Sequence, residues 1–415
     1  MNLYFTGHQE KYAVEQTMLT LFPQERPVYP DPAVTPPGGD NALELQFTRR
    51  PSWCTARAVL RREGKVYTRM CRVRTAALPA DDPVVATRLT RRTLQRAFYL
   101  AAIDCLGKEP PWGMLSGVRP VKLPTRAMEE GGTPRQAEAM LKHYHVSPVR
   151  RQLAMDCAQA SLAVKRSLQP EEISLYVGIP FCPTRCAYCS FISASGSANR
   201  LIPAYLDALF GEIDAAGEAA RRAGKTVRTV YIGGGTPTTL APDQLKALLD
   251  RLHTAFDLAP GTEFTVEAGR PDTITREKLE AIRDGGGNRI SVNPQTMSDL
   301  VLETIGRSHR AEDIRQAYAL AREVGVGAIN MDLIAGLPAD TLEGFAATLD
   351  EVIGMDPENI TVHTLALKKG ARLRQENVPL PSGADVAHML DFAWSALRAA
   401  GYQPSYLYRQ KFMSG

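Results

Sequence analysis

The chain has 415 residues, of which 44% are hydrophobic and 23% are charged. This balance is typical of a globular protein and excludes the disordered, collagen-like and coiled-coil classes. No run of about 18 apolar residues indicates a membrane span. The first eight residues lack the basic and apolar regions of a secretory signal, so we expect a cytoplasmic protein. At about 150 residues per domain, the length predicts two to three domains.

Charge is divided unevenly along the chain. Residues 1–170 contain 25 Lys and Arg against 15 Asp and Glu, a net charge of +10. The remainder contains 24 against 30, a net charge of −6. A basic N-terminal third suits contact with nucleic acid or with an anionic small molecule, and a merely solvated basic face has the same composition.

The first 170 residues are predicted to form a small α+β domain. Leu43, Leu45 and Phe47 alternate with polar residues, as in a half-buried strand. Up to residue 80 the pattern is mostly strand, with a hairpin turn at 61–64 and a Pro- and Gly-rich loop at 27–39. A basic loop punctuated by Gly and Pro follows at 112–126. We expect strands at 2–6, 42–48, 56–60 and 65–73, and helices at 83–106, 134–143 and 148–168.

From residue 173, short apolar strands alternate with amphipathic helices. Six such repeats predict a parallel sheet, either an open barrel or a doubly wound sheet. The expected strands are 174–178, 229–233, 263–267, 289–293, 328–334 and 359–364, and the expected helices are 201–223, 242–256, 275–284, 311–324 and 341–353, with a later one at 384–400. We therefore expect a basic α+β domain at 1–170, an α/β core at 171–380, and at 381–415 the start of a helical C-terminal region, incomplete in this chain.

Three of the seven cysteines lie close together directly after the first of these strands. Cys182, Cys186 and Cys189 form a C-x3-C-x2-C pattern. Three thiolates on one tight loop can hold three irons of a cubane iron–sulfur cluster and leave the fourth iron open to another ligand. Zinc is the main alternative, but a structural zinc site normally has four ligands, and no second Cys or His pair lies nearby.

The other four cysteines are scattered, and they are expected to be small buried apolar side chains: Cys54, Cys71, Cys105 and Cys157. An odd total without an export signal argues against a disulfide framework.

Further polar and glycine residues follow the later strands. Residues 233–238 read Gly-Gly-Gly-Thr-Pro-Thr, and glycines let the backbone approach a ligand closely, although a tight βα turn has the same pattern. Four polar residues, each unremarkable alone, lie at or after later strand ends, where the sites of barrel proteins collect: Glu267, Gln295, Arg307 and Asp332.

Together these motifs resemble those of the radical S-adenosylmethionine (SAM) enzymes. The resemblance rests on the cysteine pattern, with an aromatic residue, Tyr188, before its last cysteine, and on the GGGTPT loop. The resemblance implies a partial (β/α)6 barrel and a [4Fe-4S] cluster held by the three cysteines, whose open iron binds SAM. It also implies a SAM site made by Tyr176, Tyr188, Gly234, Gly235, Thr236, Glu267, Gln295, Arg307 and Asp332. It assigns no catalytic residue.

Within that superfamily the chain is most similar to the oxygen-independent coproporphyrinogen III oxidases (dehydrogenases). The VNPQTM and DLIAGLP segments and Tyr176, six residues before Cys182, carry this likeness over roughly residues 170–370. Gly117-Val118-Arg119-Pro120 extends it to the branch with a basic N-terminal domain. The resemblance implies oxidative decarboxylation of two propionates of a porphyrinogen to vinyls in haem biosynthesis. An electron donor such as flavodoxin or ferredoxin is implied as a partner.

One departure keeps a second function open. The best-understood branch has a fourth cysteine two residues after the third, and this chain has Phe191 there. That form is shared with haem chaperones, which carry haem instead of oxidising a porphyrinogen. A nucleic-acid-modifying enzyme is a third alternative, disfavoured because no basic motif interleaved with aromatic residues is present. For a tetracarboxylate substrate, we expect Arg119, Lys122 and Arg126 to bind its propionates.

Overall fold

The computed structural model describes residues 1–31, 38–115, 119–191, 194–368, 370–376 and 378–409. Two of the motif residues named above, Gly117 and Val118, lie outside these ranges. The described chain forms two compact units, each treated separately below: Met1–Val164 with Pro404–Arg409, and Lys165–Gln403. The expected division at residues 170 and 380 stays a prediction. No helix in the described ranges is long and apolar enough to cross a membrane.

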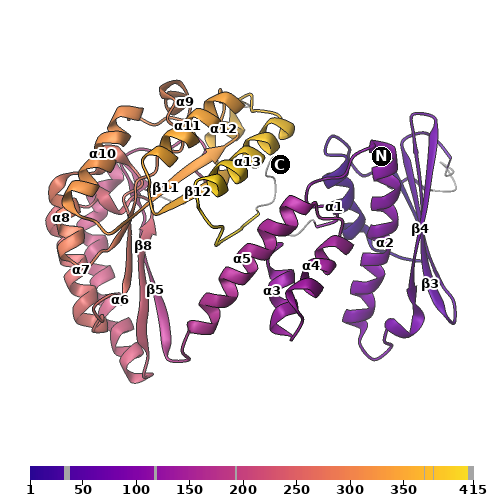
Figure 1. The fold of residues 1–415 in the computed structure, drawn as a ribbon, viewed down its shortest axis with the longest axis horizontal. Coiled ribbons are helices and arrows are strands. Elements are labelled where there is room, and N and C mark those ends of the chain that lie inside the picture. Colours follow the sequence, from indigo (N-terminus) through magenta and orange to yellow (C-terminus); the bar gives the residue numbers. More distant parts are fainter. Residues whose placement is uncertain (32–37, 116–118, 192–193, 369, 377, 410–415) are drawn as a thin grey trace. The chain divides into compact units, whose positions relative to one another are not determined.

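The first unit contains a four-stranded sheet in chain order (Figure 1), with a parallel first pair and antiparallel neighbours thereafter. Its strands are β1 (Asn2–Thr6), β2 (Ala42–Arg49), β3 (Trp53–Arg62) and β4 (Lys65–Arg74). The alternation in β2 is confirmed, since Leu43, Leu45 and Phe47 are buried. The β3–β4 turn is tighter than expected because Glu63 and Gly64 both take positive φ, as a two-residue hairpin turn requires.

Helix α2 (Pro83–Leu106) packs its apolar stripe, including Leu94 and Phe98, against this sheet. It begins where expected because the Asp82 side chain caps Val85 N–H at 2.9 Å, and it ends at Gly107 in the left-handed conformation. The expectation that residues 1–80 are mostly strand was wrong at helix α1 (Lys11–Leu21). This helix also packs into the core of this unit, and its apolar face is short.

Three further helices complete the first unit: α3 (Lys122–Glu129), α4 (Pro134–His143) and α5 (Pro148–Ser167). The expected loop at 112–126 was wrong in its last part, because α3 begins at Lys122. Pro124 is tolerated there, since first-turn residues of a helix lack an intrahelical acceptor for their N–H. A separate small core, with Trp112, Leu141 and Tyr144, joins these helices.

The second unit contains a six-stranded parallel sheet whose strands lie in chain order. They are β5 (Glu172–Ile179), β8 (Thr226–Gly234), β9 (Glu263–Glu267), β10 (Arg289–Ser291), β11 (Ala328–Ala335) and β12 (Asn359–Thr364). A doubly wound sheet would reverse its order part-way. The unbroken order therefore decides for the partial (β/α)6 barrel, and the predicted fold class is confirmed.

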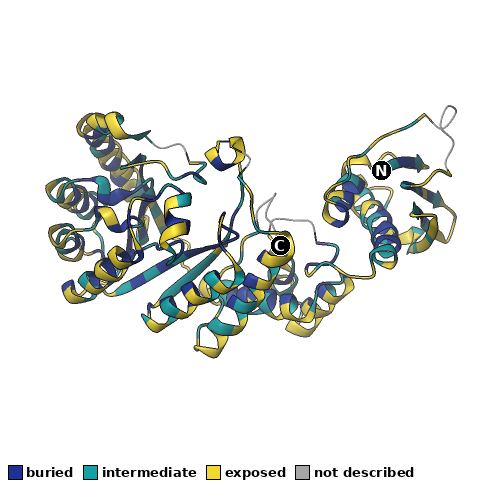
Figure 2. Ribbon diagram, turned by 90° about the horizontal axis from the view of Figure 1, so that it is seen from above, coloured by how far each residue is buried: buried dark blue, intermediate teal, exposed yellow. Residues whose placement is uncertain are grey.

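One helix follows each strand but the last and covers one side of the sheet (Figure 1). These are α6 (Ile202–Arg222), α7 (Pro242–Phe256), α8 (Arg276–Asp284), α10 (Ala311–Val324) and α11 (Leu342–Gly354). The strand residues are mostly buried or of intermediate burial, and the outer helix faces are exposed (Figure 2). Helix α13 (Gly383–Ala399) packs on α11. The shorter elements of the chain are η1 (Thr75–Ala77), β6 (Phe181–Cys182), β7 (Ala194–Ser195), η2 (Gly196–Leu201), η3 (Pro237–Thr239), η4 (Pro271–Thr273), α9 (Asp299–Thr304) and α12 (Arg372–Gln375).

The core of this unit lies between sheet and helices, where Ile232, Val266 and Leu333 of the strands meet Leu245 and Leu249 of α7. Because all six strands are parallel, their carboxyl ends share one rim. The polar residues that follow the strands are thereby brought together.

Candidate cofactor site

The loop with the three cysteines is held by backbone hydrogen bonds at several points. Strand β6, which contains Cys182, pairs with β7, and Ala194 N–H donates to Pro180 O at 2.8 Å. In the middle of the loop, buried Ala187 donates its N–H to Ile305 O at 2.9 Å and accepts from Leu373 N–H at 3.0 Å. The positions of the cysteines therefore depend on segments far along the chain.

The glycine loop is bound directly to the cysteine loop. Gly235 N–H donates to Ile179 O at 2.8 Å, and Thr236 N–H donates to Phe181 O at 2.7 Å. A Cβ on Gly235 would lie 2.4 Å from Phe181 O, so only glycine allows this approach. The Thr236 hydroxyl lies 3.5 Å from Cys182 Sγ and can donate to it.

A carboxylate and two tyrosines lie beside this loop. Glu267, at the end of β9, accepts from Gly234 N–H at 3.2 Å and from Tyr231 OH at 2.5 Å. Burial raises the pKa of Glu267, and the nearby Asp332 charge adds to the rise. The Tyr231 ring stacks on exposed Tyr176, with centroids 6.0 Å apart and planes 14° apart. This corner offers a carboxylate acceptor and a flat aromatic surface.

Arg307 is a buried cation at the same rim. Its Nη1 donates to Gly269 O at 3.0 Å and to Asn293 O at 3.3 Å, and its Nη2 donates to Tyr188 OH at 3.0 Å. The buried Nε has no acceptor, and among the described residues no carboxylate forms an ion pair with Arg307. A buried guanidinium without a counter-ion suits an anionic ligand.

Gln295 and Asp332 complete the set. Gln295 is buried with a positive φ of 69°, and its N–H donates to Asp332 O at 2.9 Å. Asp332 accepts from Asn330 Nδ2 at 2.8 Å, and it raises the pKa of His363, whose Nε2 lies 3.8 Å from Asp332 Oδ2. Asp332 can therefore accept further hydrogen bonds from ligand hydroxyls.

One cavity of about 360 Å³ is lined by the three cysteines, the glycine loop and the polar residues of the rim. Every residue expected from the sequence to bind cluster or SAM is among its lining: Cys182, Cys186, Cys189, Tyr176, Tyr188, Gly234, Gly235, Thr236, Glu267, Gln295, Arg307 and Asp332. The structure thus brings together side chains that are separated by as much as 156 residues, from Tyr176 to Asp332. Their individual roles remain predictions.

The sequence pattern of the radical SAM superfamily matches residues 176–352, which include most of the residues that line this cavity. Residues 176–352 form a radical SAM domain. The resemblance carried by the cysteine and glycine loops is thereby confirmed. A [4Fe-4S] cluster and SAM, the cofactors expected from the sequence, are those of this superfamily.

Two named relatives align with this domain. The chain is 38% identical over 312 residues to the oxygen-independent coproporphyrinogen-III oxidase-like protein HemZ of Bacillus subtilis, an alignment that covers 73% of this chain and 62% of HemZ. It is 34% identical to the heme chaperone HemW of Bacillus subtilis, over 55% of this chain and 60% of HemW.

A solved structure supports the same fold. Coproporphyrinogen III oxidase (HemN) from Escherichia coli, described as a radical SAM enzyme, matches with a TM-score of 0.53 and 32% identity over 59% of this chain and 56% of that chain. The chain spans about 60% of the length of the curated relatives named here.

The cysteine loop of the radical SAM domain fits a cluster by its chemistry. Arg270 Nη1 lies 3.8 Å from Cys186 Sγ and can donate to it, and a nearby cation favours thiolate over thiol. In the described ranges no three His, Cys, Asp or Glu side chains are placed so that they could hold one metal ion. A cubane differs because each cysteine binds a different iron. The remaining cysteines lie in the first unit, where burial raises the pKa of Cys157 to about 12.

Sequence reasoning missed two residues of the cavity, Arg270 and His363, and also Tyr231, which contacts the lining residues Tyr176 and Glu267. Arg270 is buried, forms a bidentate ion pair with Asp272 (2.9 and 2.7 Å), and donates to Thr184 Oγ1 at 3.1 Å. Its position three residues after Glu267, just beyond a strand end, was the available signal. Tyr231 lies opposite Tyr176 in the β5–β8 register, which the spacing of the two strands could have shown.

Proposed function

We propose that Cys182, Cys186 and Cys189 bind a [4Fe-4S] cluster and that SAM binds in the adjoining cavity. The observation that carries this proposal is the single cavity lined by all twelve expected residues together with the unpaired, buried Arg307. When bound and reduced, the cluster with SAM supplies a 5′-deoxyadenosyl radical for hydrogen abstraction.

This chain's residues have distinct tasks in the proposal. Arg307 pairs with the carboxylate of SAM, because it is a buried cation with a free donor. Glu267 and Asp332 accept hydrogen bonds from the ligand's ammonium or hydroxyl groups. Tyr176 and Tyr231 offer a stacked aromatic surface at the rim, and the packed glycine and cysteine loops exclude water from the cluster side.

The substrate class proposed is a porphyrinogen, specifically coproporphyrinogen III, with two propionates converted to vinyls. For each propionate the radical takes one hydrogen atom, CO2 leaves, and an electron acceptor takes the remaining electron. The names of HemZ and HemN support this choice, and an electron donor protein such as flavodoxin or ferredoxin would supply the reducing electron. A haem chaperone is the second candidate. It is favoured by the HemW relatives and by exposed Phe191, which lines the cavity where the fourth cysteine of the oxidase branch would stand.

The test is anaerobic reconstitution of the chain with iron and sulfide, followed by SAM, a reductant and coproporphyrinogen III. Formation of protoporphyrinogen supports the oxidase, and stoichiometric haem retention without product supports the chaperone. If neither product formation nor haem retention is observed and SAM is not cleaved, the proposal is refuted. Cys186→Ala should abolish cluster iron, whereas the matched Cys157→Ala, in the first unit, should retain it.

SAM affinity tests the cavity separately. Arg307→Ala should weaken SAM binding by about 1.5–3 kcal/mol, the value of one charge-assisted hydrogen bond. Arg251→Ala removes an exposed arginine of α7 and serves as the control of equal charge. Calorimetric titration that gives the same affinity for both variants would reject Arg307 as a SAM ligand.

A further inference from the structure

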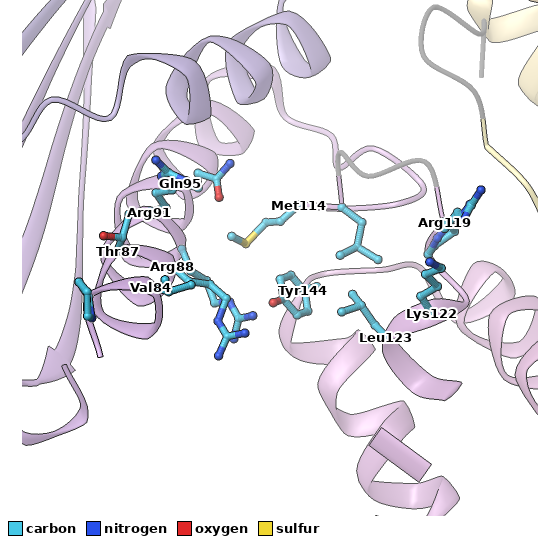
Figure 3. Close-up of a pocket in the computed structure, with 14 residues that line it drawn as sticks. Val84, Thr87, Arg88, Arg91, Gln95, Met114, Arg119, Lys122, Leu123 and Tyr144 are labelled. Atoms are coloured by element: carbon cyan, nitrogen blue, oxygen red, sulfur yellow. The ribbon is translucent and has the colours of Figure 1, made fainter. Parts of the chain in front are cut away.

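The first unit contains a second cavity, of about 870 Å³, formed entirely by residues of that unit. One wall is α2, which contributes Val84, Arg88 and Arg92. The opposite wall is formed by residues 119–123, as Figure 3 shows for Arg119, Lys122 and Leu123, with Met114 and Tyr144 between the two walls. This volume lies in the range of small-molecule sites, about 300–1,000 Å³.

The cavity has cations and no acids. None of its lining residues is Asp or Glu. Besides Arg91, four cations line it from two walls: Arg88, Arg92, Arg119 and Lys122. None of these four forms an ion pair with a carboxylate of the described residues. Some other cations of the unit are paired, as in Arg61–Glu44, Arg69–Asp104 and Arg126–Glu130.

Two further polar groups of the lining are already engaged. Arg91 forms an ion pair with Glu10, and Gln95 Nε2 donates to Ala13 O at 3.1 Å. Two of the four unpaired cations contact aromatic rings. The Arg92 guanidinium lies 5.0 Å from the Tyr144 ring centroid and is also a hydrogen-bond partner of that tyrosine, and the Arg119 guanidinium lies 5.9 Å from the ring centroid of Tyr408. Neither contact neutralises the charge, so the cations can still pair with an anionic ligand.

The space between the cations is apolar and its wall is fixed. Val84, Met114, Leu115, Leu123 and the Tyr144 ring line it. Met114 N–H donates to Tyr144 O at 2.9 Å, and Arg409 Nη1 donates to Leu115 O at 2.7 Å. Gly113, with a positive φ of 54°, permits the first contact, because a Cβ there would lie 2.3 Å from Tyr144 O.

We propose that this cavity binds a ligand that carries several carboxylates on an apolar ring system, with Arg88 and Arg92 on one side and Arg119 and Lys122 on the other. Carboxylates pair well with guanidinium groups, and the apolar floor suits a ring better than it suits a chain of phosphates. The inference rests on the proposed function only in that a porphyrinogen or haem belongs to this ligand class. Arg126, which the sequence placed with Arg119 and Lys122, does not line the cavity and pairs with Glu130 at 2.6 Å.

The probe is coproporphyrin III, a stable tetracarboxylate, titrated into the full chain and followed by its absorbance shift and by quenching of tryptophan fluorescence. Arg88→Ala/Arg92→Ala and Arg119→Ala/Lys122→Ala should each raise the Kd at least tenfold. The control Arg57→Ala/Arg72→Ala removes the same charge from exposed positions of β3 and β4, outside the cavity, and should leave the Kd within about twofold. The tetramethyl ester of the probe should bind weakly to every variant.

Three results would overturn the inference: unchanged affinity in both cavity variants, an equal loss in the control pair, or tighter binding of a short RNA oligonucleotide that depends on the same four residues. Thermal unfolding of each variant separates loss of binding from loss of fold. Titration of the triple Cys182/Cys186/Cys189→Ala chain should give the wild-type Kd, because the cavity does not depend on the cluster. In the reconstituted wild-type chain, porphyrin binding without product formation sinks the proposed activity alone, and product formation without porphyrin binding at these residues sinks the cavity alone.

Discussion

Gly235→Ala should disrupt the junction between the glycine and cysteine loops. The added Cβ would lie 2.4 Å from Phe181 O and 2.9 Å from both Phe181 C and N, where real contacts stay beyond 3.0 Å. The loops must therefore separate by at least 0.6 Å. Overpacking of this kind costs about 1–3 kcal/mol. Strain on the Gly235–Ile179 and Thr236–Phe181 hydrogen bonds costs about 0.5–1.5 kcal/mol each. We expect a total loss of about 2–6 kcal/mol.

The assay is denaturant unfolding of the unreconstituted chain, followed by iron analysis after reconstitution. Gly211→Ala is the matched control, because Gly211 lies exposed in α6 and a Cβ there meets nothing within 4 Å. It should stabilise the chain by about 1 kcal/mol through helix propensity. The variants should thus shift stability in opposite directions, and only Gly235→Ala should lower cluster iron. Equal stability of Gly235→Ala and wild type would refute the steric argument.

Two predictions concern pH. Burial raises the pKa of Asp340 from 3.8 to about 6, so its ionised form destabilises the fold above that value. The gain in unfolding free energy from Asp340→Asn should therefore fall by up to about 3 kcal/mol as the pH is lowered from 8 to 4, and a gain independent of pH in urea unfolding would contradict this. Tyr231→Phe removes a hydrogen bond that lowers the pKa of Glu267, so the pH at which SAM affinity falls on acidification should rise, and an unshifted profile would exclude the coupling.

Sequence patterns predicted the elements whose ends are marked by local chemistry. Helices Pro83–Leu106, Pro134–His143 and Pro242–Phe256 have the predicted bounds because each has Pro in its first turn and a capping interaction at its start. Helix α1 has no side-chain cap at Glu10, and α3 contains a proline, so neither carried a local signal. Tertiary packing forms both.

The sequence predicted which residues line the cavity of the radical SAM domain, but it did not predict which of their side chains contact one another. Residues that follow parallel strands must meet at one rim, which placed Glu267, Arg307 and Asp332 together. That Arg270 reaches Cys186, or that His363 faces Asp332, depends on side-chain contacts between strands with no fixed spacing in the sequence. The second cavity was hidden for the same reason, since its cations come from two segments more than 20 residues apart.

The two backbone hydrogen bonds of Ala187 set an order of events during synthesis. Its partners, Ile305 and Leu373, are translated 118 and 186 residues later. At about 5–20 residues per second, the cysteine loop emerges roughly 10–40 s before Leu373 can hold it. During that interval the three thiols belong to a loop without its later contacts. If iron is inserted before Leu373 is translated, the cysteine loop lacks its later hydrogen bonds and its thiols are still open to oxidation. If iron is inserted afterwards, those hydrogen bonds already hold the loop.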